Sequence, residues 1–89
     1  MIELSDYVKD DKSLQFLQTI KEDLDVTSQT EVFLRLGDFH FYFEPQGEKI
    51  EVFSDGESLG VFETIDDLFL NFKIDGKPFI ERISEIEYD

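Results

Sequence analysis

His40 is the only histidine in the chain and the first residue to consider for catalysis. An imidazole works as a general base when a second group, most often a carboxylate, orients the ring. The expected neighbour of His40, across a hairpin, is Arg35, which cannot serve in that way. We find no serine or lysine nucleophile with the necessary support, and the chain contains no cysteine. We therefore interpret His40 as a surface residue on a strand and predict that the protein is not an enzyme.

Carboxylates are the other chemically active groups, and several of them are close neighbours in the sequence. Asp10 and Asp11, Asp55 and Glu57, and Asp66 and Asp67 form such pairs. A calcium loop needs alternating oxygen ligands, a central glycine and a distant glutamate, and no pair has that spacing. The glycines also do not form a phosphate-binding loop. We expect neither a metal site nor a cofactor.

The charge of the chain is the strongest indication of function. The 89 residues include 22 Asp and Glu but only eight Lys and Arg, which gives a formal charge of −14. Such a surface repels nucleic-acid backbones and anionic membranes, and it attracts basic proteins. We expect no nucleic-acid or membrane partner. Solubility alone is an alternative explanation of the acidity, and it stays open.

The expected location is the cytoplasm. The first residues lack the basic region and apolar run of a signal peptide, and no apolar stretch is long enough to cross a bilayer. The absence of cysteine fits a reducing compartment.

The elements that position these residues follow from hydrophobic spacing. Apolar residues three and four apart predict an N-terminal helix that carries Leu14, Leu17, Ile20 and Leu24 on its inner side. Strand alternation follows in residues 30–36, 39–44, 49–54 and 57–62. Thr64 and Pro78 suit the starts of two short C-terminal helices, and Ile80, Ile83 and Ile86 are expected on the inner side of the second one. We predict one α+β domain over residues 1–89, with an N-terminal helix, a four-stranded antiparallel β-meander and two short helices.

Two turns predict the register of the strands. A two-residue loop at Gly37-Asp38 places Val32, Leu34 and Leu36 on one face together with Phe39, Phe41 and Phe43. A second loop at Asp55-Gly56 pairs Val52 with Leu59 and Ile50 with Val61, again on that apolar face. The opposite, mixed face then carries Phe33, Arg35, His40, Tyr42, Glu51, Phe53, Gly60 and Phe62.

The mixed face is the expected site of function, because aromatic residues and arginine dominate binding hot spots. A face left open would bind a partner, whereas a face covered by helices on both sides of the sheet or by a homodimer would not. Both alternatives stay open. The candidate partner-binding residues are Phe33, Arg35, His40, Tyr42, Glu44, Glu51, Phe53, Phe62, Asp66 and Asp67.

The chain is of a general type, small, acidic and free of cysteine, that includes bacterial immunity proteins and nucleic-acid mimics. The similarity is one of type, and no residue role follows from it. We expect a non-enzymatic module that engages a basic protein, such as a toxin or nuclease, as an inhibitor or antidote. The alternatives are a homo-oligomeric structural domain and a mimic of a nucleic-acid backbone.

Overall fold

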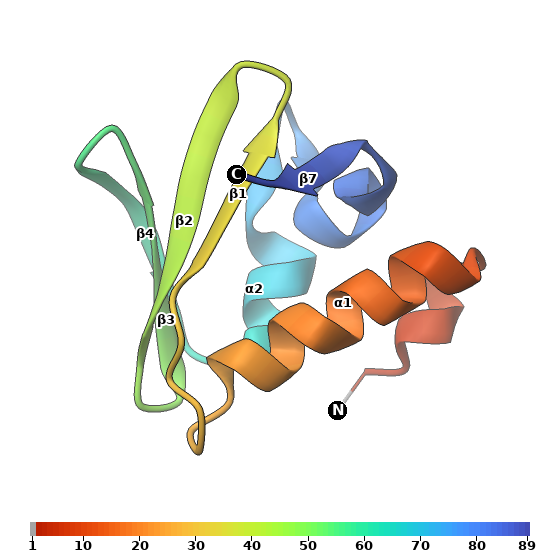
Figure 1. The fold of residues 1–89 in the computed structure, drawn as a ribbon, viewed down its shortest axis with the longest axis horizontal. Coiled ribbons are helices and arrows are strands. Elements are labelled where there is room, and N and C mark those ends of the chain that lie inside the picture. The colour runs from red at the N-terminus through yellow and green to blue at the C-terminus, as the bar shows by residue number, and fades with distance from the viewer. Residues whose placement is uncertain (1) are drawn as a thin grey trace.

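A computed structural model describes residues 2–89, and it confirms the α+β class (Figure 1). Met1, the first residue of the predicted domain, lies outside the described residues. The elements are η1 (Leu4–Asp6), α1 (Asp11–Leu24), β1 (Val32–Leu36), β2 (Phe39–Gln46), β3 (Lys49–Ser54), β4 (Glu57–Phe62), α2 (Ile65–Asn71), β5 (Lys73–Ile74), β6 (Lys77–Pro78), η2 (Phe79–Glu85) and β7 (Ile86–Tyr88), where η denotes a 3₁₀ helix.

Both α-helices, α1 and α2, begin at a residue whose side chain caps them. The Oδ2 atom of Asp10 accepts a hydrogen bond from the Ser13 amide at 2.8 Å at the start of α1. This bond lowers the pKa of Asp10 below its ordinary value. The Oγ1 atom of Thr64 accepts a hydrogen bond from the Asp67 amide at 3.0 Å and caps α2 in the same way.

The first hairpin has the predicted register. Val32 lies opposite Phe43, Leu34 opposite Phe41 and Leu36 opposite Phe39. Gly37 has a φ of +60°, which a residue without a Cβ adopts readily in a tight turn. Most of this apolar face is buried, so the turn and the alternation together predict the first half of the sheet correctly.

The second hairpin corrects our predicted register. Near the turn, Phe53 lies opposite Ser58 as expected, but a bulge then shifts the pairing. Val52 lies opposite Gly60 and Ile50 opposite Phe62, so Phe62 is on the covered face and not on the mixed one. A bulge adds one residue to one strand, and every later side chain changes face.

The C-terminal part also differs from the prediction. We expected a second helix from Pro78 that would include Ile86, but residues 79–85 form the 3₁₀ helix η2 and Ile86 begins the strand β7. β7 pairs antiparallel with β1, which makes a five-stranded sheet in the order β4-β3-β2-β1-β7. Ile86 is buried, as predicted, although in a different element.

The helices and the sheet form two layers. In Figure 1 α1, α2 and η2 all lie on the same side of the sheet. Helix α1 contacts β1 and β2, whereas α2 contacts β3 and β4. The fully buried rings of Phe43, Phe69 and Phe79 lie between the layers. No element among residues 2–89 covers the opposite side of the sheet, which we call the open face.

Candidate functional site

The open face collects side chains from four neighbouring strands. Strand alternation and the observed register assign its members. They are Phe33 and Arg35 from β1, His40, Tyr42, Glu44 and Gln46 from β2, Lys49, Glu51 and Phe53 from β3, and Ser58 and Val61 from β4.

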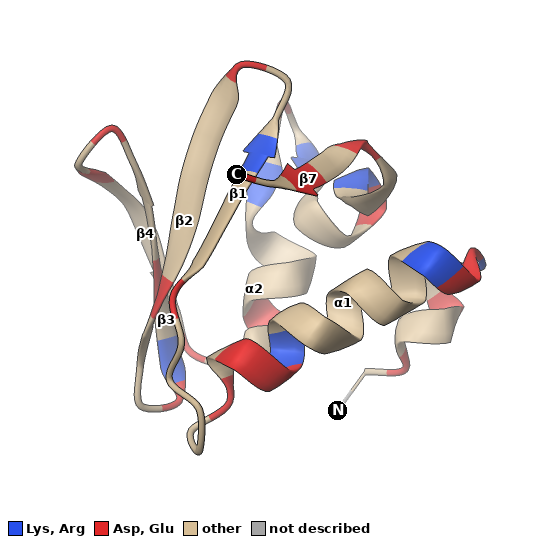
Figure 2. Cartoon of the chain, viewed as in Figure 1, with Lys and Arg blue, Asp and Glu red and all other residues tan. Residues whose placement is uncertain are grey.

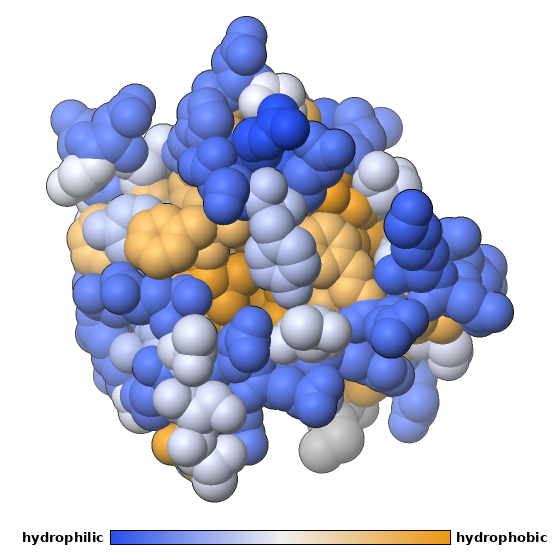
Figure 3. All heavy atoms as spheres, in the orientation of Figure 1, coloured by the Kyte–Doolittle hydropathy of each residue, from blue (hydrophilic) through white to orange (hydrophobic). Residues whose placement is uncertain are grey.

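A row of three aromatic rings crosses the middle of the open face. The ring centroids of Phe33 and Tyr42 are 5.0 Å apart, and those of Tyr42 and Phe53 are 5.2 Å apart. The planes of Tyr42 and Phe53 are only 19° from parallel. Phe33 is 49% exposed, and the other two rings are half-buried. Figure 3 shows, on the side it presents, hydrophobic side chains gathered over the strands between hydrophilic ones.

An ion pair and a histidine–carboxylate hydrogen bond flank this row near β7. Arg35 Nη2 lies 2.6 Å from Glu87 Oε2, and His40 Nδ1 lies 2.8 Å from Asp89 Oδ2. Arg35 and His40 lie opposite each other, as predicted. Our expectation that His40 has no carboxylate partner was wrong, because β7 and the residue after it were not predicted beside β1.

The pair of His40 and Asp89 does not extend to a nucleophile in the described structure. The hydroxyl of Ser54 donates a hydrogen bond of 2.6 Å to the main-chain carbonyl of His40, so it is not directed at the imidazole. Residues 2–89 also contain no group of three or more histidine or carboxylate side chains that could hold a metal ion.

Two glutamates lie directly opposite each other beside the aromatic row. Glu44 of β2 faces Glu51 of β3, next to the pair of Tyr42 and Phe53. The Nε2 atom of Gln46 donates to Glu44 Oε2 at 3.1 Å and to Glu51 Oε1 at 2.9 Å. Hydrogen bonds from the side chains of Ser58 and Gln46 lower the pKa of Glu51 below its ordinary value.

Three predicted site residues do not belong to the open face. Phe62 lies on the covered side, where its ring centroid is 6.0 Å from that of Phe72. Asp66 and Asp67 lie in the first turn of α2, and both carboxylates accept hydrogen bonds from the main chain. The structure therefore brings together Phe33, Arg35, His40, Tyr42, Glu44, Glu51 and Phe53 of our predicted set.

Sequence reasoning missed other members of the open face. Val61 was assigned to the core, yet it lies opposite Glu51 and is 51% exposed. Gln46 lay outside the predicted strand of residues 39–44, although it continues the alternation of His40, Tyr42 and Glu44. That period of two was visible in the sequence and could have identified Gln46.

Charge is distributed unevenly over the molecule. Figure 2 shows acidic residues at hairpin tips, at helix ends and on β7, with few basic residues between them. The open face holds both signs, but Arg35 pairs with Glu87, and Lys49 Nζ lies 3.7 Å from Glu63 Oε2. Glu44 and Glu51 have no ion-pair partner among the described residues.

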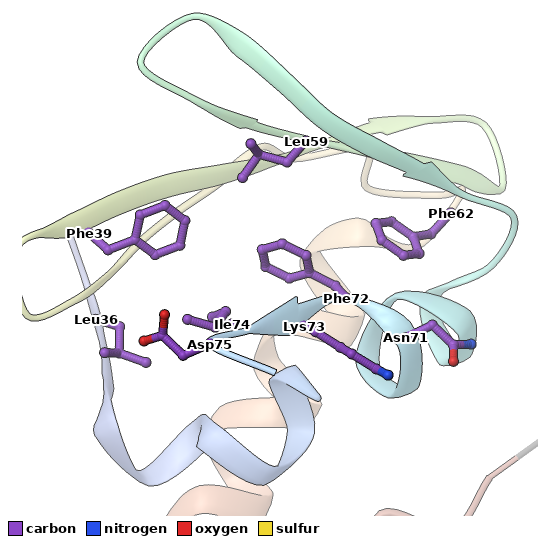
Figure 4. Close-up of a pocket in the computed structure, with 9 residues that line it drawn as sticks. All are labelled: Leu36, Phe39, Leu59, Phe62, Asn71, Phe72, Lys73, Ile74 and Asp75. Carbon is purple, nitrogen blue, oxygen red and sulfur yellow. The ribbon is translucent and has the colours of Figure 1, made fainter. Parts of the chain in front are cut away.

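A hollow of about 560 Å³ lies on the covered side of the sheet, near β4 (Figure 4). Phe39, Leu59 and Phe62 from the sheet and Phe72 from the facing segment point into it. Lys73 and Asp75 are the charged residues of its lining. The hollow therefore offers apolar contact and holds no cluster of catalytic groups.

No protein-family model matches this chain, and searches of curated proteins and of solved structures found no significant match. Within residues 2–89, no helix combines the length and the apolar character that crossing a membrane requires.

Proposed function

We propose that this chain is a non-enzymatic binding module that engages a basic protein through the open face. The row of Phe33, Tyr42 and Phe53 carries the proposal, because these rings are partly exposed on a sheet face that no element among residues 2–89 covers. Exposed neighbouring aromatics have the composition of an interface centre, where tyrosine and arginine contribute most of the affinity.

The charge of the partner follows from that of the chain. A protein with a formal charge of −14 is steered toward a positive surface, and this raises the association rate at low salt. Glu44, Glu51 and Glu87 place negative charge around the aromatic row. The aromatic centre would supply contact area, and the glutamates would select a basic partner. An inhibitor or antidote of a basic toxin or nuclease, acting in the cytoplasm, fits this description.

Two alternatives remain proposals of lower rank. A homodimer through the open face would bring together two chains that each carry a charge of −14, and it would oppose like charges at the glutamates. A nucleic-acid mimic needs carboxylates at phosphate-like spacing along one face. The aromatic row interrupts the carboxylates of the open face, which favours the basic protein partner.

The experiment begins with affinity capture at low salt, followed by purification of the basic protein recovered. A basic toxin or nuclease encoded beside this chain is the first candidate to test. Its dissociation constant is then measured for the wild type, for Tyr42→Ala and for Tyr7→Ala, which removes a 46% exposed tyrosine away from the open face. The proposal expects weaker binding for Tyr42→Ala only. Equal binding by all three proteins would refute it, and light scattering of the chain alone tests the homodimer.

A further inference from the structure

We propose that the open face holds an arginine side chain of the basic partner, stacked on Tyr42 and Phe53 and paired with Glu44 and Glu51. The inference rests on the proposed function and specifies the chemistry of the partner. Its basis is the position of a stacked pair of rings beside two carboxylates that face each other across two strands.

Tyr42 and Phe53 form an offset stack, with ring centroids 5.2 Å apart, in which each ring covers only part of the other. Tyr42 and Phe53 are nearly parallel and half-buried, so part of each ring remains open to solvent. A guanidinium group is planar and weakly hydrated, and it stacks on aromatic rings at distances up to about 6 Å from the centroid. An ammonium group binds aromatic rings as well, but it lacks the planar shape.

The carboxylates lie within reach of a cation that is stacked on these rings. Glu44 follows Tyr42 by two residues on β2, and Glu51 precedes Phe53 by two residues on the antiparallel β3, which corresponds to about 6.8 Å on the same face. Carboxylates that lie directly opposite each other destabilise a sheet by repulsion. The amide of Gln46, which donates to both, reduces this repulsion but adds no charge. A cation from the partner would supply that charge.

The hydrogen bonds to Glu51 favour its ionised form and leave some of its acceptor positions unused. Ser58 and Gln46 donate to it and lower its pKa. A carboxylate has about four acceptor positions, so further positions remain for the N–H groups of an arginine. The forked donors of a guanidinium can bridge two oxygens, which a single ammonium does less well.

Lys49 is the resident cation nearest to this site in the register. It lies opposite Gln46 on the open face, and its Nζ atom is 3.7 Å from Glu63 Oε2. The pair with Glu63 draws the ammonium toward the end of β4. Lys49→Met removes a cation that competes with the partner for Glu44 and Glu51. We therefore expect this variant to bind arginine more tightly.

The test uses three synthetic peptides of six residues: all arginine, all lysine and all citrulline, the last being an uncharged isostere of arginine. Each is titrated into isotopically labelled protein, and backbone amide shifts are followed by NMR. We expect the arginine peptide to shift the amides of Tyr42, Glu44, Glu51 and Phe53 most. The double variant Glu44→Gln with Glu51→Gln should bind about tenfold more weakly, the loss expected when charge-assisted hydrogen bonds are removed.

The matched control places the same change in charge on the helical layer. Glu22→Gln with Glu3→Gln removes two exposed carboxylates outside the sheet. It should leave the affinity for the arginine peptide within about twofold of the wild type, since only general attraction is reduced. Equal weakening by both double variants, or equal binding of arginine and lysine peptides, would overturn the inference.

The natural partner separates this inference from the proposed function. If the partner's binding depends on Tyr42 but not on Glu44 and Glu51, the inference fails and the proposed function stands. If its binding depends on none of the three, both fail. If its binding depends on all three and is lost when one of its arginines is changed to lysine, the inference is supported.

Discussion

Tyr42 and Phe53 lie directly opposite each other on β2 and β3, with ring centroids 5.2 Å apart and planes 19° from parallel. On a covered sheet such a pair would belong to the core. Here the helices lie on the other side, so the two rings remain half-buried at a surface. Because the pair lies at a surface, its contribution to partner binding can be measured separately from its contribution to the stability of the fold.

Tyr42→Ala should weaken partner binding much more than it weakens the fold. The loss of two aromatic contacts costs about 0.5–1.5 kcal/mol each, which a folded domain of this kind withstands. Loss of an interface anchor costs about tenfold or more in affinity. Thermal unfolding measures the change in stability, and calorimetric titration of the same preparations measures the change in affinity for the partner. A variant that unfolds at room temperature would show that Tyr42 belongs to the core.

Truncation of Phe62 should lower the free energy of unfolding more than truncation of Val61 does, which is the reverse of the order that the sequence predicts. Phe62 packs against Phe72 on the covered side, whereas Val61 is exposed on the open face. Phe62→Ala should lower the free energy of unfolding by about 2 kcal/mol, less than for a fully buried ring. Val61→Ala should change it by about 0.5 kcal/mol or less. Urea unfolding measures both, and the reverse order would contradict the bulge in β4.

Gly60 should resist replacement because of its backbone and not because of space. Its φ is +146°, a conformation that residues with a Cβ rarely adopt. A Cβ at this position would lie 3.6 Å from the Phe62 ring, which is an ordinary contact. Gly60→Ala should therefore cost about 1–3 kcal/mol through strain. Leu59→Ala, beside it, serves as the control, since Leu59 is 44% exposed; equal costs for the two would argue against strain at Gly60.

Acid should remove a stabilising contact of Glu85. Arg82 donates from Nε to Glu85 Oε2 at 2.7 Å and from Nη2 to Oε1 at 3.1 Å, and this holds the pKa of Glu85 below its ordinary value. A lowered folded-state pKa gives stability that is present above the unfolded pKa, about 4.3. That stability is lost as the pH falls through the folded pKa.

The melting temperature of Glu85→Gln should consequently be lower than that of the wild type at neutral pH, and the difference should shrink below about pH 4. Glu81→Gln is the control, because Glu81 is exposed on the same 3₁₀ helix. Circular dichroism melts across the pH range measure both. A gap for Glu85→Gln that does not change with pH would contradict the role of this ion pair.

The sequence correctly predicts the first hairpin, because its strand pairing is determined by residues that are close together in the chain. A two-residue turn sets the pairs next to it, and in the first hairpin nothing interrupts the ladder from Leu36 to Val32. In the second hairpin the turn sets Phe53 opposite Ser58, but the bulge after it has no local signal except Gly60. The register in which Phe62 lies on the covered side, half-buried, and Val61 is exposed depends on packing against Phe72 at the end of α2, which the strand pattern does not contain.

The C-terminal segment shows a second limit. Ile80, Ile83 and Ile86 are spaced by three, which suits one side of an α-helix and also the three residues per turn of a 3₁₀ helix. The prediction of burial was correct for all three, and Ile80 and Ile83 do lie in a helix, but Ile86 lies in the strand β7. Because β7 was not expected, the ion pair Arg35–Glu87 and the contact between His40 and Asp89, the residue after β7, were not predicted either.

The central claim, that the open face engages a basic protein, is tested most directly by mapping the bound surface. The labelled chain is titrated with its purified basic partner at about 50 mM and about 500 mM salt, and amide shifts are assigned to residues. We predict that Phe33, Tyr42, Glu51 and Phe53 shift most, and that binding weakens strongly at the higher salt. Shifts confined to the helical layer, or an affinity indifferent to salt, would contradict the account.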